Sequence, residues 1–148
     1  MDFKRIILHC TATDERSHVD VATIRKWHKQ RGFSDCGYHY LIHLDGSVEA
    51  GRPVSKMGAH TKGHNSDSIG IAYAGGIDYK TRKPKDTMTM YQEIAYLRMV
   101  DSLRAVFGEL TIHGHNEFSR KSCPCFIVQD KFSFLKIKEH GAINKPLG

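Results

Sequence analysis

The sequence predicts an α/β fold in which a mixed central β-sheet is flanked by α-helices. Several short apolar segments have the length and composition of buried strands, and longer segments between them repeat apolar residues at helical spacing. Strands that alternate with helices usually pair into one sheet that the helices cover. A chain of 148 residues is most simply one domain. We expect this domain over residues 1–141 and a loose tail over 142–148.

The expected strands are short and end at small or polar residues. We place them at Arg5–Cys10, His39–Leu44, Ser47–Ala50, Ser68–Ala74 and Leu110–His113. The dipeptide Asp45-Gly46 separates the second from the third, which is a strong signal for a β-hairpin. Gly75-Gly76 would end the fourth strand. The segments 51–67 and 77–86 show no clear period, so we expect loops there.

The first helix is expected to begin after Asp20, whose side chain can cap it, and to run from about Val21 to Gln30. Gly32 is a suitable end for such a helix. Trp27 falls at helical spacing from Ile24, so we expect its indole in the core.

The second helix is expected to begin at Thr89-Met90-Tyr91-Gln92, a possible capping box, and to end near Phe107 before Gly108. We expect its apolar residues at helical spacing to form a core face. These residues are Met90, Ile94, Leu97, Val100, Leu103 and Phe107. A last helix, capped by Asp130, should turn Phe134, Leu135 and Ile137 inward and end near Gly141.

Composition excludes several classes of protein. The sequence holds no apolar run near 18 residues, so no transmembrane helix or membrane insertion is expected. The first residues do not resemble a signal peptide, which predicts synthesis in the cytoplasm. The net charge of +6 favours anionic partners such as nucleic acid, acidic lipid or a cell-wall polymer, with solubility alone as the alternative explanation. Because nucleic-acid motifs are absent, we do not expect a nucleic-acid partner.

The four cysteines, Cys10, Cys36, Cys123 and Cys125, could form two disulfides. Without a secretory signal, free thiols or metal ligands are the better expectation. Only one residue separates Cys123 from Cys125, and the sequence has no second CxxC pair. This spacing argues against a purely structural zinc finger.

The segment His113–Pro124 concentrates groups that can bind a metal. His115 and Cys123 are eight residues apart, which suits two ends of a loop folded around an ion, and His113 is an alternative ligand. His9 lies at the end of the first expected strand and His115 just past the last one, so the two can converge at one edge of the sheet. Two nitrogens, a thiolate and a water are the pattern of a catalytic zinc. Lys121 could lie beside such an ion and stabilise an oxyanion.

Eight segments carry a resemblance to a known family, and they follow one another in the family's order. They are Leu8-His9-Cys10-Thr11-Ala12-Thr13, Ile24-Arg25-Lys26-Trp27-His28, Gly37-Tyr38-His39-Tyr40, Asp45-Gly46-Ser47-Val48-Glu49-Ala50-Gly51-Arg52, Gly58-Ala59-His60-Thr61-Lys62-Gly63-His64-Asn65 with Ser68-Ile69-Gly70-Ile71, and His115-Asn116-Glu117 with Lys121-Ser122-Cys123-Pro124. Over roughly residues 5–137 the chain resembles the zinc-dependent N-acetylmuramoyl-L-alanine amidases of the bacteriophage T7 lysozyme type. These enzymes share their fold with the peptidoglycan recognition proteins.

The resemblance implies a role for each matching residue. His9, His115 and Cys123 match the zinc ligands, and the family's spacing of eight selects His115 over His113. Tyr38 and Lys121 match the catalytic pair. Because a phenol's reference pKa is near 10, we expect Tyr38 to orient water or donate a hydrogen bond rather than act as a general base.

Two further residues of the matching segments are candidates for substrate binding. His60 is expected to contact the peptide or the sugar, with a structural loop histidine as the alternative, and Asn65 is a weaker candidate. Asn116 stands where the phage enzyme has a second histidine, so a histidine there is not expected to be essential. Cys125 matches no ligand, and we expect a packed free thiol.

The resemblance therefore implies a monomeric amidase with one Zn²⁺ per chain that acts on peptidoglycan or muropeptides. It would hydrolyse the amide between the lactyl group of N-acetylmuramic acid and L-alanine. A phage or prophage lysin would reach the cell wall after release, and a recycling enzyme would act on cytoplasmic muropeptides. The alternatives are a non-catalytic peptidoglycan-binding module, which the presence of Cys123 disfavours, and a basic nucleic-acid binder.

Overall fold

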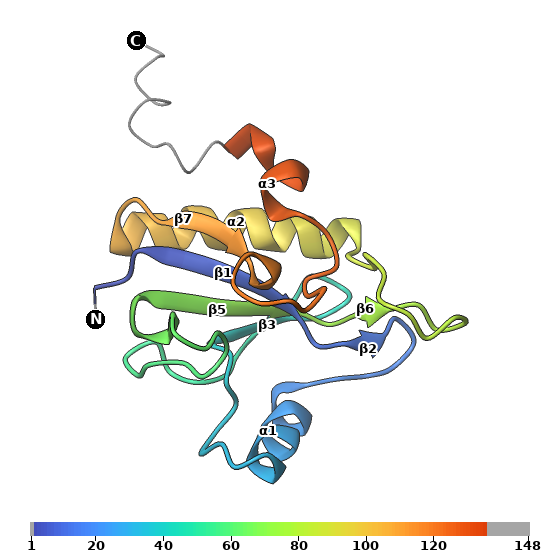
Figure 1. Cartoon of the computed structure of the whole chain (residues 1–148). Helices are drawn as coiled ribbons and strands as arrows, with labels where there is room; N and C mark the ends of the chain where they lie inside the picture. Colours follow the sequence, from blue (N-terminus) through green and yellow to red (C-terminus); the bar gives the residue numbers. More distant parts are fainter. Residues whose placement is uncertain (1, 136–148) are drawn as a thin grey trace.

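A computed structural model describes residues 2–135 and contains one central sheet of five strands with helices on both faces (Figure 1). The strand order is β4-β3-β5-β1-β7. The strands are β1 (Arg5–Cys10), β3 (Tyr40–Ile42), β4 (Val48–Ala50), β5 (Ser68–Tyr73) and β7 (Thr111–Gly114). Only the β3–β4 hairpin is antiparallel, and the other neighbours pair in parallel. The mixed sheet expected from the sequence is confirmed.

The two faces of the sheet differ in side-chain size, and β5 shows why. Its large residues Ile69, Ile71 and Tyr73 join the main core cluster beneath α2 (Met90–Phe107). Its alternate residues are small, and Ala72 belongs to a second cluster with residues of α1 (Val21–Gln30). Successive side chains of a strand point to opposite faces. The small residues Ser68, Gly70 and Ala72 therefore leave space on the α1 side of the sheet.

Helix α1 begins where the sequence predicts, because the Asp20 carboxylate accepts a hydrogen bond from the Thr23 backbone N–H at 2.8 Å. The expectation that Trp27 lies in the core is wrong. Its side chain is 39% exposed, and the buried positions of the helix are Val21, Ile24 and His28. His28 is held inside because its Nδ1 accepts the Gly37 backbone N–H at 2.8 Å.

Helix α2 has the predicted capping box, with Thr89 and Gln92 bonded to each other's backbone N–H groups. Its predicted core face is only partly right. Val100 and Leu103 are buried, but Met90 is 67% and Ile94 42% exposed. The buried face instead includes the following residues: Gln92, Ala95 and Tyr96. Gln92 is buried because its amide donates to backbone oxygens of the sheet, Ile42 O at 3.2 Å and Ala74 O at 3.0 Å.

The Asp45-Gly46 hairpin is confirmed, with shorter strands than expected, and Gly46 has a positive φ of 90°. The sequence did not predict a second sheet, formed by β2 (Thr13–Asp14) and β6 (Gly76–Ile77). Each of these strands has only two residues, which is too short for an alternation of apolar and polar residues to be recognised. Residues 51–67 form the expected loop and include one 3₁₀ turn, Asn65–Asp67.

The predicted start of the last helix, after a cap at Asp130, is wrong. The structure has a short helix α3 (Val128–Lys131) followed by a 3₁₀ turn (Ser133–Leu135), and Asp130 lies within α3 rather than capping it. Phe134, predicted to face inward, is 63% exposed, whereas Leu135 packs partly buried against the core. Ile137, the expected helix end near Gly141 and the tail 142–148 lie outside the described residues. Among the described residues, no helix is long and apolar enough to cross a membrane.

The pairing of β1 with β7 positions the next residues of each strand. The two are parallel neighbours, with Leu8 opposite Gly114. His9 follows Leu8, and His115 follows Gly114 at the start of a 3₁₀ turn (His115–Glu117). Their ring centroids are 4.5 Å apart. The convergence of these histidines at one sheet edge, expected from the sequence, is therefore present.

Candidate metal centre and active-site cleft

His9, His115 and Cys123 form a group of side chains that could hold a metal ion. One ligand atom from each lies within 4.8 Å of the other two. His9 comes from β1, His115 from the turn after β7, and Cys123 from the loop that leads to α3. Two imidazole nitrogens and one sulfur are a donor set that suits zinc. The alternative ligand His113 is engaged elsewhere, because its Nδ1 lies 2.8 Å from the Glu117 carboxylate.

The metal-binding group lines a cleft of about 620 Å³, which also includes Tyr38 and Lys121. The Tyr38 ring centroid lies 5.1 Å from that of His9. Lys121 lines the same cleft as His9 and His115, and its charge adds to the effect of burial in lowering the pKa of both. The structure thus brings together all five residues predicted as zinc ligands or catalytic groups.

The cleft keeps its histidines neutral and its tyrosine protonated. Burial, reinforced by electrostatic interaction with the neighbouring His60 and His115 rings, holds the pKa of His9 well below its usual value. Burial also lowers the pKa of His115, and the charge of Lys121 lowers it further. The pKa of Tyr38 is raised chiefly by burial. Neutral imidazoles can bind a metal, and a protonated phenol can donate a hydrogen bond.

The cysteine ligand candidate is tied to β1. Its sulfur accepts a hydrogen bond from the Cys10 backbone N–H at 3.1 Å. Cys10 Sγ lies 3.9 Å from Cys125 Sγ, and the Cys125 thiol donates to Gly76 O at 3.3 Å. The hydrogen bond between the Cys10 and Cys123 side chains, the desolvation of the thiol and other contacts raise the pKa of Cys10 to about 12. All four cysteines are free thiols.

His60 and Asn65, the predicted substrate contacts, also line the cleft. His60 is 9% exposed, and its Nδ1 lies 2.9 Å from His9 Nε2. The Asn65 side-chain oxygen accepts the backbone N–H groups of His60 and Thr61, at 2.9 and 2.8 Å. Burial lowers the pKa of His60 to about 3, so its ring is neutral near pH 7. Contact of either residue with a substrate stays a prediction.

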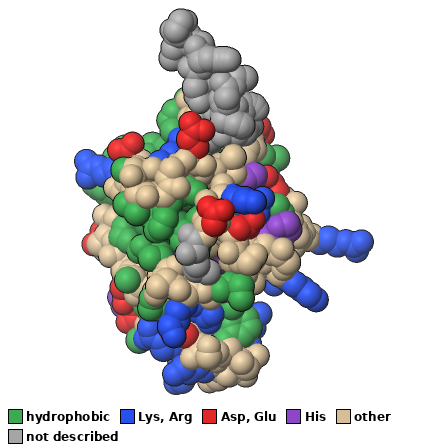
Figure 2. All heavy atoms as spheres, turned by 90° about the vertical axis from the view of Figure 1, so that its left-hand side faces the viewer, with side chains coloured by type: hydrophobic (Ala, Val, Ile, Leu, Met, Phe, Trp, Pro, Cys, Tyr) green, Lys and Arg blue, Asp and Glu red, His purple; other side chains and the backbone are tan. Residues whose placement is uncertain are grey.

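Several residues that line the cleft were not predicted as site residues. They are Trp27, Arg31, Phe33, Lys62 and Phe118. Trp27 belongs to one of the segments that resemble the amidase family. A large aromatic side chain on the exposed side of α1 is the signal that could have indicated its place in the cleft. Among the described residues that line the cleft, three are cationic and none is acidic. Lys and Arg side chains also gather over α1 at the bottom of Figure 2.

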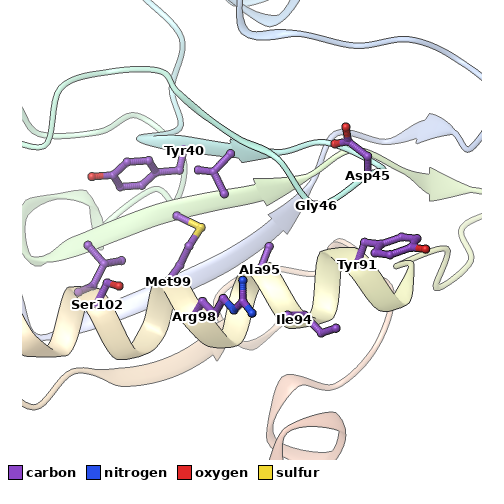
Figure 3. A pocket seen from close by; sticks show the side chains of 11 residues that line it. Tyr40, Asp45, Gly46, Tyr91, Ile94, Ala95, Arg98, Met99 and Ser102 are labelled. Atoms are coloured by element: carbon purple, nitrogen blue, oxygen red, sulfur yellow. The ribbon is translucent and has the colours of Figure 1, made fainter.

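A second hollow of about 490 Å³ lies between α2 and the β3–β4 hairpin. Figure 3 shows Met99 pointing from α2 toward the sheet, with Tyr40 on β3 and Arg98 and Ile94 along the helix. None of the three candidate metal ligands lines it. Among the described residues, the group that could hold a metal therefore lies in the cleft and not in this hollow.

Comparison with known proteins agrees with this geometry. Residues 1–126 match the family described as N-acetylmuramoyl-L-alanine amidase. The chain belongs to this amidase family. It is 40% identical over 121 residues to the endolysin of Escherichia phage T7, a match that covers 82% of this chain and 80% of that protein.

Two solved structures share the fold. The N-acetylmuramoyl-L-alanine amidase LysC from Clostridium intestinale is 26% identical, with a TM-score of 0.78 over 93% of this chain and 87% of that one. The bumblebee peptidoglycan recognition protein PGRP-SA is 24% identical, with a TM-score of 0.75 over 90% of this chain and 81% of that one, and shows the fold alone. The family and the fold implied by the resemblance are confirmed.

Proposed function

We propose that this protein is a zinc-dependent N-acetylmuramoyl-L-alanine amidase that degrades cell-wall peptidoglycan as a phage-type lysin. It hydrolyses the amide bond between the lactyl group of N-acetylmuramic acid and L-alanine. One observation carries the proposal. In a chain of the amidase family, His9, His115 and Cys123 present ligand atoms within 4.8 Å of one another in a cleft that Tyr38 and Lys121 also line.

The three candidate ligands fit one zinc ion per chain. His9 is buried and neutral, so a ring nitrogen has a lone pair for the metal. The Cys10 backbone N–H donates to Cys123 Sγ and holds the sulfur in place beside the strand that carries His9. A cysteine binds metal as its thiolate. When bound, zinc supplies Lewis acidity, which polarises a carbonyl and lets water act as a nucleophile near neutral pH.

The remaining groups of the cleft act on the substrate. The Lys121 ammonium stabilises the negative charge that develops on the substrate's carbonyl oxygen when the carbonyl carbon becomes tetrahedral. The Tyr38 phenol stays protonated because burial raises its pKa, so it orients the attacking water or donates to the same oxygen. The C–N bond breaks after the nitrogen takes up a proton released by the attacking water, and L-alanine leaves as the free amine.

The charge of the cleft suits this substrate. Arg31, Lys62 and Lys121 line it, and no acidic residue is among its described lining residues. The stem peptides of peptidoglycan carry carboxylates, which such a cleft attracts. The three candidate ligands, Tyr38 and Lys121 form a complete set within one chain, and we propose that the enzyme acts as a monomer.

The deciding experiment incubates zinc-loaded protein with purified peptidoglycan and measures both newly exposed L-alanine amino groups and new reducing ends. We expect amino groups to appear while the glycan chains remain intact, and chelation of the metal to stop the release. New reducing ends would show a glycosidase instead. Tight binding to the wall with no release from any wall type would support the peptidoglycan-binding module.

A further inference from the structure

A buried chain of hydrogen-bonding side chains runs from Ser68 through His60 to His9. His60 Nε2 lies 3.3 Å from Ser68 Oγ, and His60 Nδ1 lies 2.9 Å from His9 Nε2. We propose that His60 is a positioning residue whose Nδ1 accepts a hydrogen bond from the Nε2–H of His9. This hydrogen bond leaves the lone pair of His9 on Nδ1, where it can bind the metal. The inference rests on the proposed zinc site and adds a role for a residue that does not touch the metal.

The donors available in this series of hydrogen bonds determine which ring nitrogens carry protons. The Ser68 hydroxyl has one proton, which it donates to His64 O at 2.6 Å. Its oxygen can therefore only accept from His60, so His60 Nε2 carries a proton. In a neutral imidazole the other nitrogen is then bare. A bare His60 Nδ1 at 2.9 Å requires His9 Nε2 to be the donor, because two lone pairs at that distance would repel.

Thr61 closes the arrangement from a third side. Its Oγ1 lies 3.2 Å from His9 Nε2 and 2.9 Å from His60 Nδ1. The hydroxyl oxygen can share the Nε2–H of His9 with His60 Nδ1 as a second acceptor. Whether His60 Nδ1 or Thr61 Oγ1 accepts the hydrogen bond, its donor is a protonated His9 Nε2. The bare nitrogen of His9 is therefore Nδ1.

The backbone around His60 is built to hold its ring in place. A Cβ added at Gly70 would lie 2.5 Å from the His60 ring, and one added at Gly58 would lie 2.7 Å from it. Asn65 fixes the loop by accepting the backbone N–H groups of His60 and Thr61. The ring thus has one position, and its Nδ1 faces His9.

Such a partner has a physical consequence for metal binding. A hydrogen-bond acceptor on the second ring nitrogen of a ligand histidine sets its tautomer, fixes its orientation and raises its basicity. Loss of such partners typically weakens metal binding about 10- to 100-fold. A histidine that only contacted the substrate would change substrate binding and leave the affinity for zinc unchanged.

The test compares His60→Leu with His60→Asn, two side chains of the same branched shape. The Asn oxygen can take the place of the Nδ1 acceptor, and Leu has no acceptor. Zinc affinity is measured by competition with a chromophoric chelator, and the thermal midpoint of each metal-free variant reports its folding. We expect His60→Leu to weaken zinc binding about 10- to 100-fold and His60→Asn to remain within a few-fold of the wild type.

Equal zinc affinity in all three proteins, or an equal loss in both variants with intact folds, would overturn the proposal. If His60→Leu does not fold, the tautomer is measured on the metal-free wild type by long-range ¹H–¹⁵N NMR, with His9→Gln to assign the signals. A proton on His9 Nε2 supports the inference, and one on Nδ1 rejects it. Because this measurement needs no zinc, a wild type that binds no zinc would refute the proposed metal enzyme separately.

Discussion

The backbone N–H of Cys10 donates to the sulfur of Cys123 over 3.1 Å, although 113 residues separate the two in sequence. Cys10 directly follows His9, so one hydrogen bond ties the loop of the third candidate ligand to the strand that carries the first. The relative placement of two ligands is therefore set by the backbone of β1.

The first prediction concerns Cys123. We expect Cys123→Ser to lose most of its bound zinc and nearly all amidase activity, because a hydroxyl is a much poorer zinc ligand than a thiolate. Cys125→Ser is the matched control and should retain zinc and activity, since Cys125 is not in the metal-binding group. Zinc content by atomic emission and release of L-alanine amino groups check both. Full activity in Cys123→Ser would rule out the proposed ligand set.

The second prediction concerns Tyr38. Tyr38→Phe should lower kcat by about 10²-fold or more, as removal of an oxyanion donor does elsewhere, while zinc content stays the same. Because burial raises the pKa of this phenol above its usual value, the wild-type rate should show no loss from tyrosine ionisation up to about pH 10. A pH–rate profile of both proteins checks this. An unchanged kcat in the variant would remove Tyr38 from the mechanism.

The third prediction concerns Lys121. Lys121→Met keeps the length of the side chain and removes its charge, and we expect kcat to fall by about 10²- to 10³-fold with zinc retained. Arg120→Met is the control, because it removes the neighbouring exposed charge, which does not line the cleft. Steady-state kinetics on a soluble muropeptide separate the two. Similar losses in both variants would indicate a general effect of charge rather than a catalytic ammonium.

The fourth prediction compares two buried tyrosines. The Tyr73 hydroxyl donates to Pro124 O at 2.7 Å, whereas the Tyr96 hydroxyl has no hydrogen-bond partner among the described residues. Tyr73→Phe should lower the free energy of unfolding by about 1–2 kcal/mol, because it leaves a buried carbonyl without its donor. Tyr96→Phe should be neutral or stabilising, since it removes an unpaired buried polar group. Urea unfolding measures both, and the reverse order would contradict this account.

The fifth prediction concerns pH. His39 is buried, its Nδ1 accepts the Gly70 backbone N–H at 3.0 Å, and burial lowers its pKa. The unfolded chain binds a proton as the pH falls through about 6.5, and the folded imidazole resists it. The stability that His39 contributes is thus fully present above that pH and declines below it.

We therefore expect the thermal midpoint of the metal-free protein to fall between pH 7 and 5. His39→Asn, which keeps an acceptor for Gly70 N–H but cannot be protonated, should show a shallower decline. Differential scanning calorimetry at several pH values checks this. The same slope in both proteins would assign the pH dependence to other groups, among them His28, whose pKa burial also lowers.

Local chemistry made several elements predictable. The Asp20 cap, the Thr89–Gln92 capping box and the Asp45-Gly46 turn each depend on residues a few positions apart, and all three are present. The buried face of α2 was less predictable, because apolar residues occur on more than one side of this helix. Packing against the sheet decides which side of the helix is buried. Backbone oxygens of the sheet accept hydrogen bonds from the Gln92 amide, while Met90 and Ile94 remain exposed.

The sequence by itself determined the fold class, the family and the set of groups available for chemistry, because these depend on residue type, spacing and order. It also indicated that His9 and His115 could meet, since both follow expected strands. Only the tertiary structure decided that β1 lies beside β7, that Trp27 faces the cleft, and that His60 lies against His9. The reason is physical: these contacts join residues far apart in sequence, and long-range packing selects them.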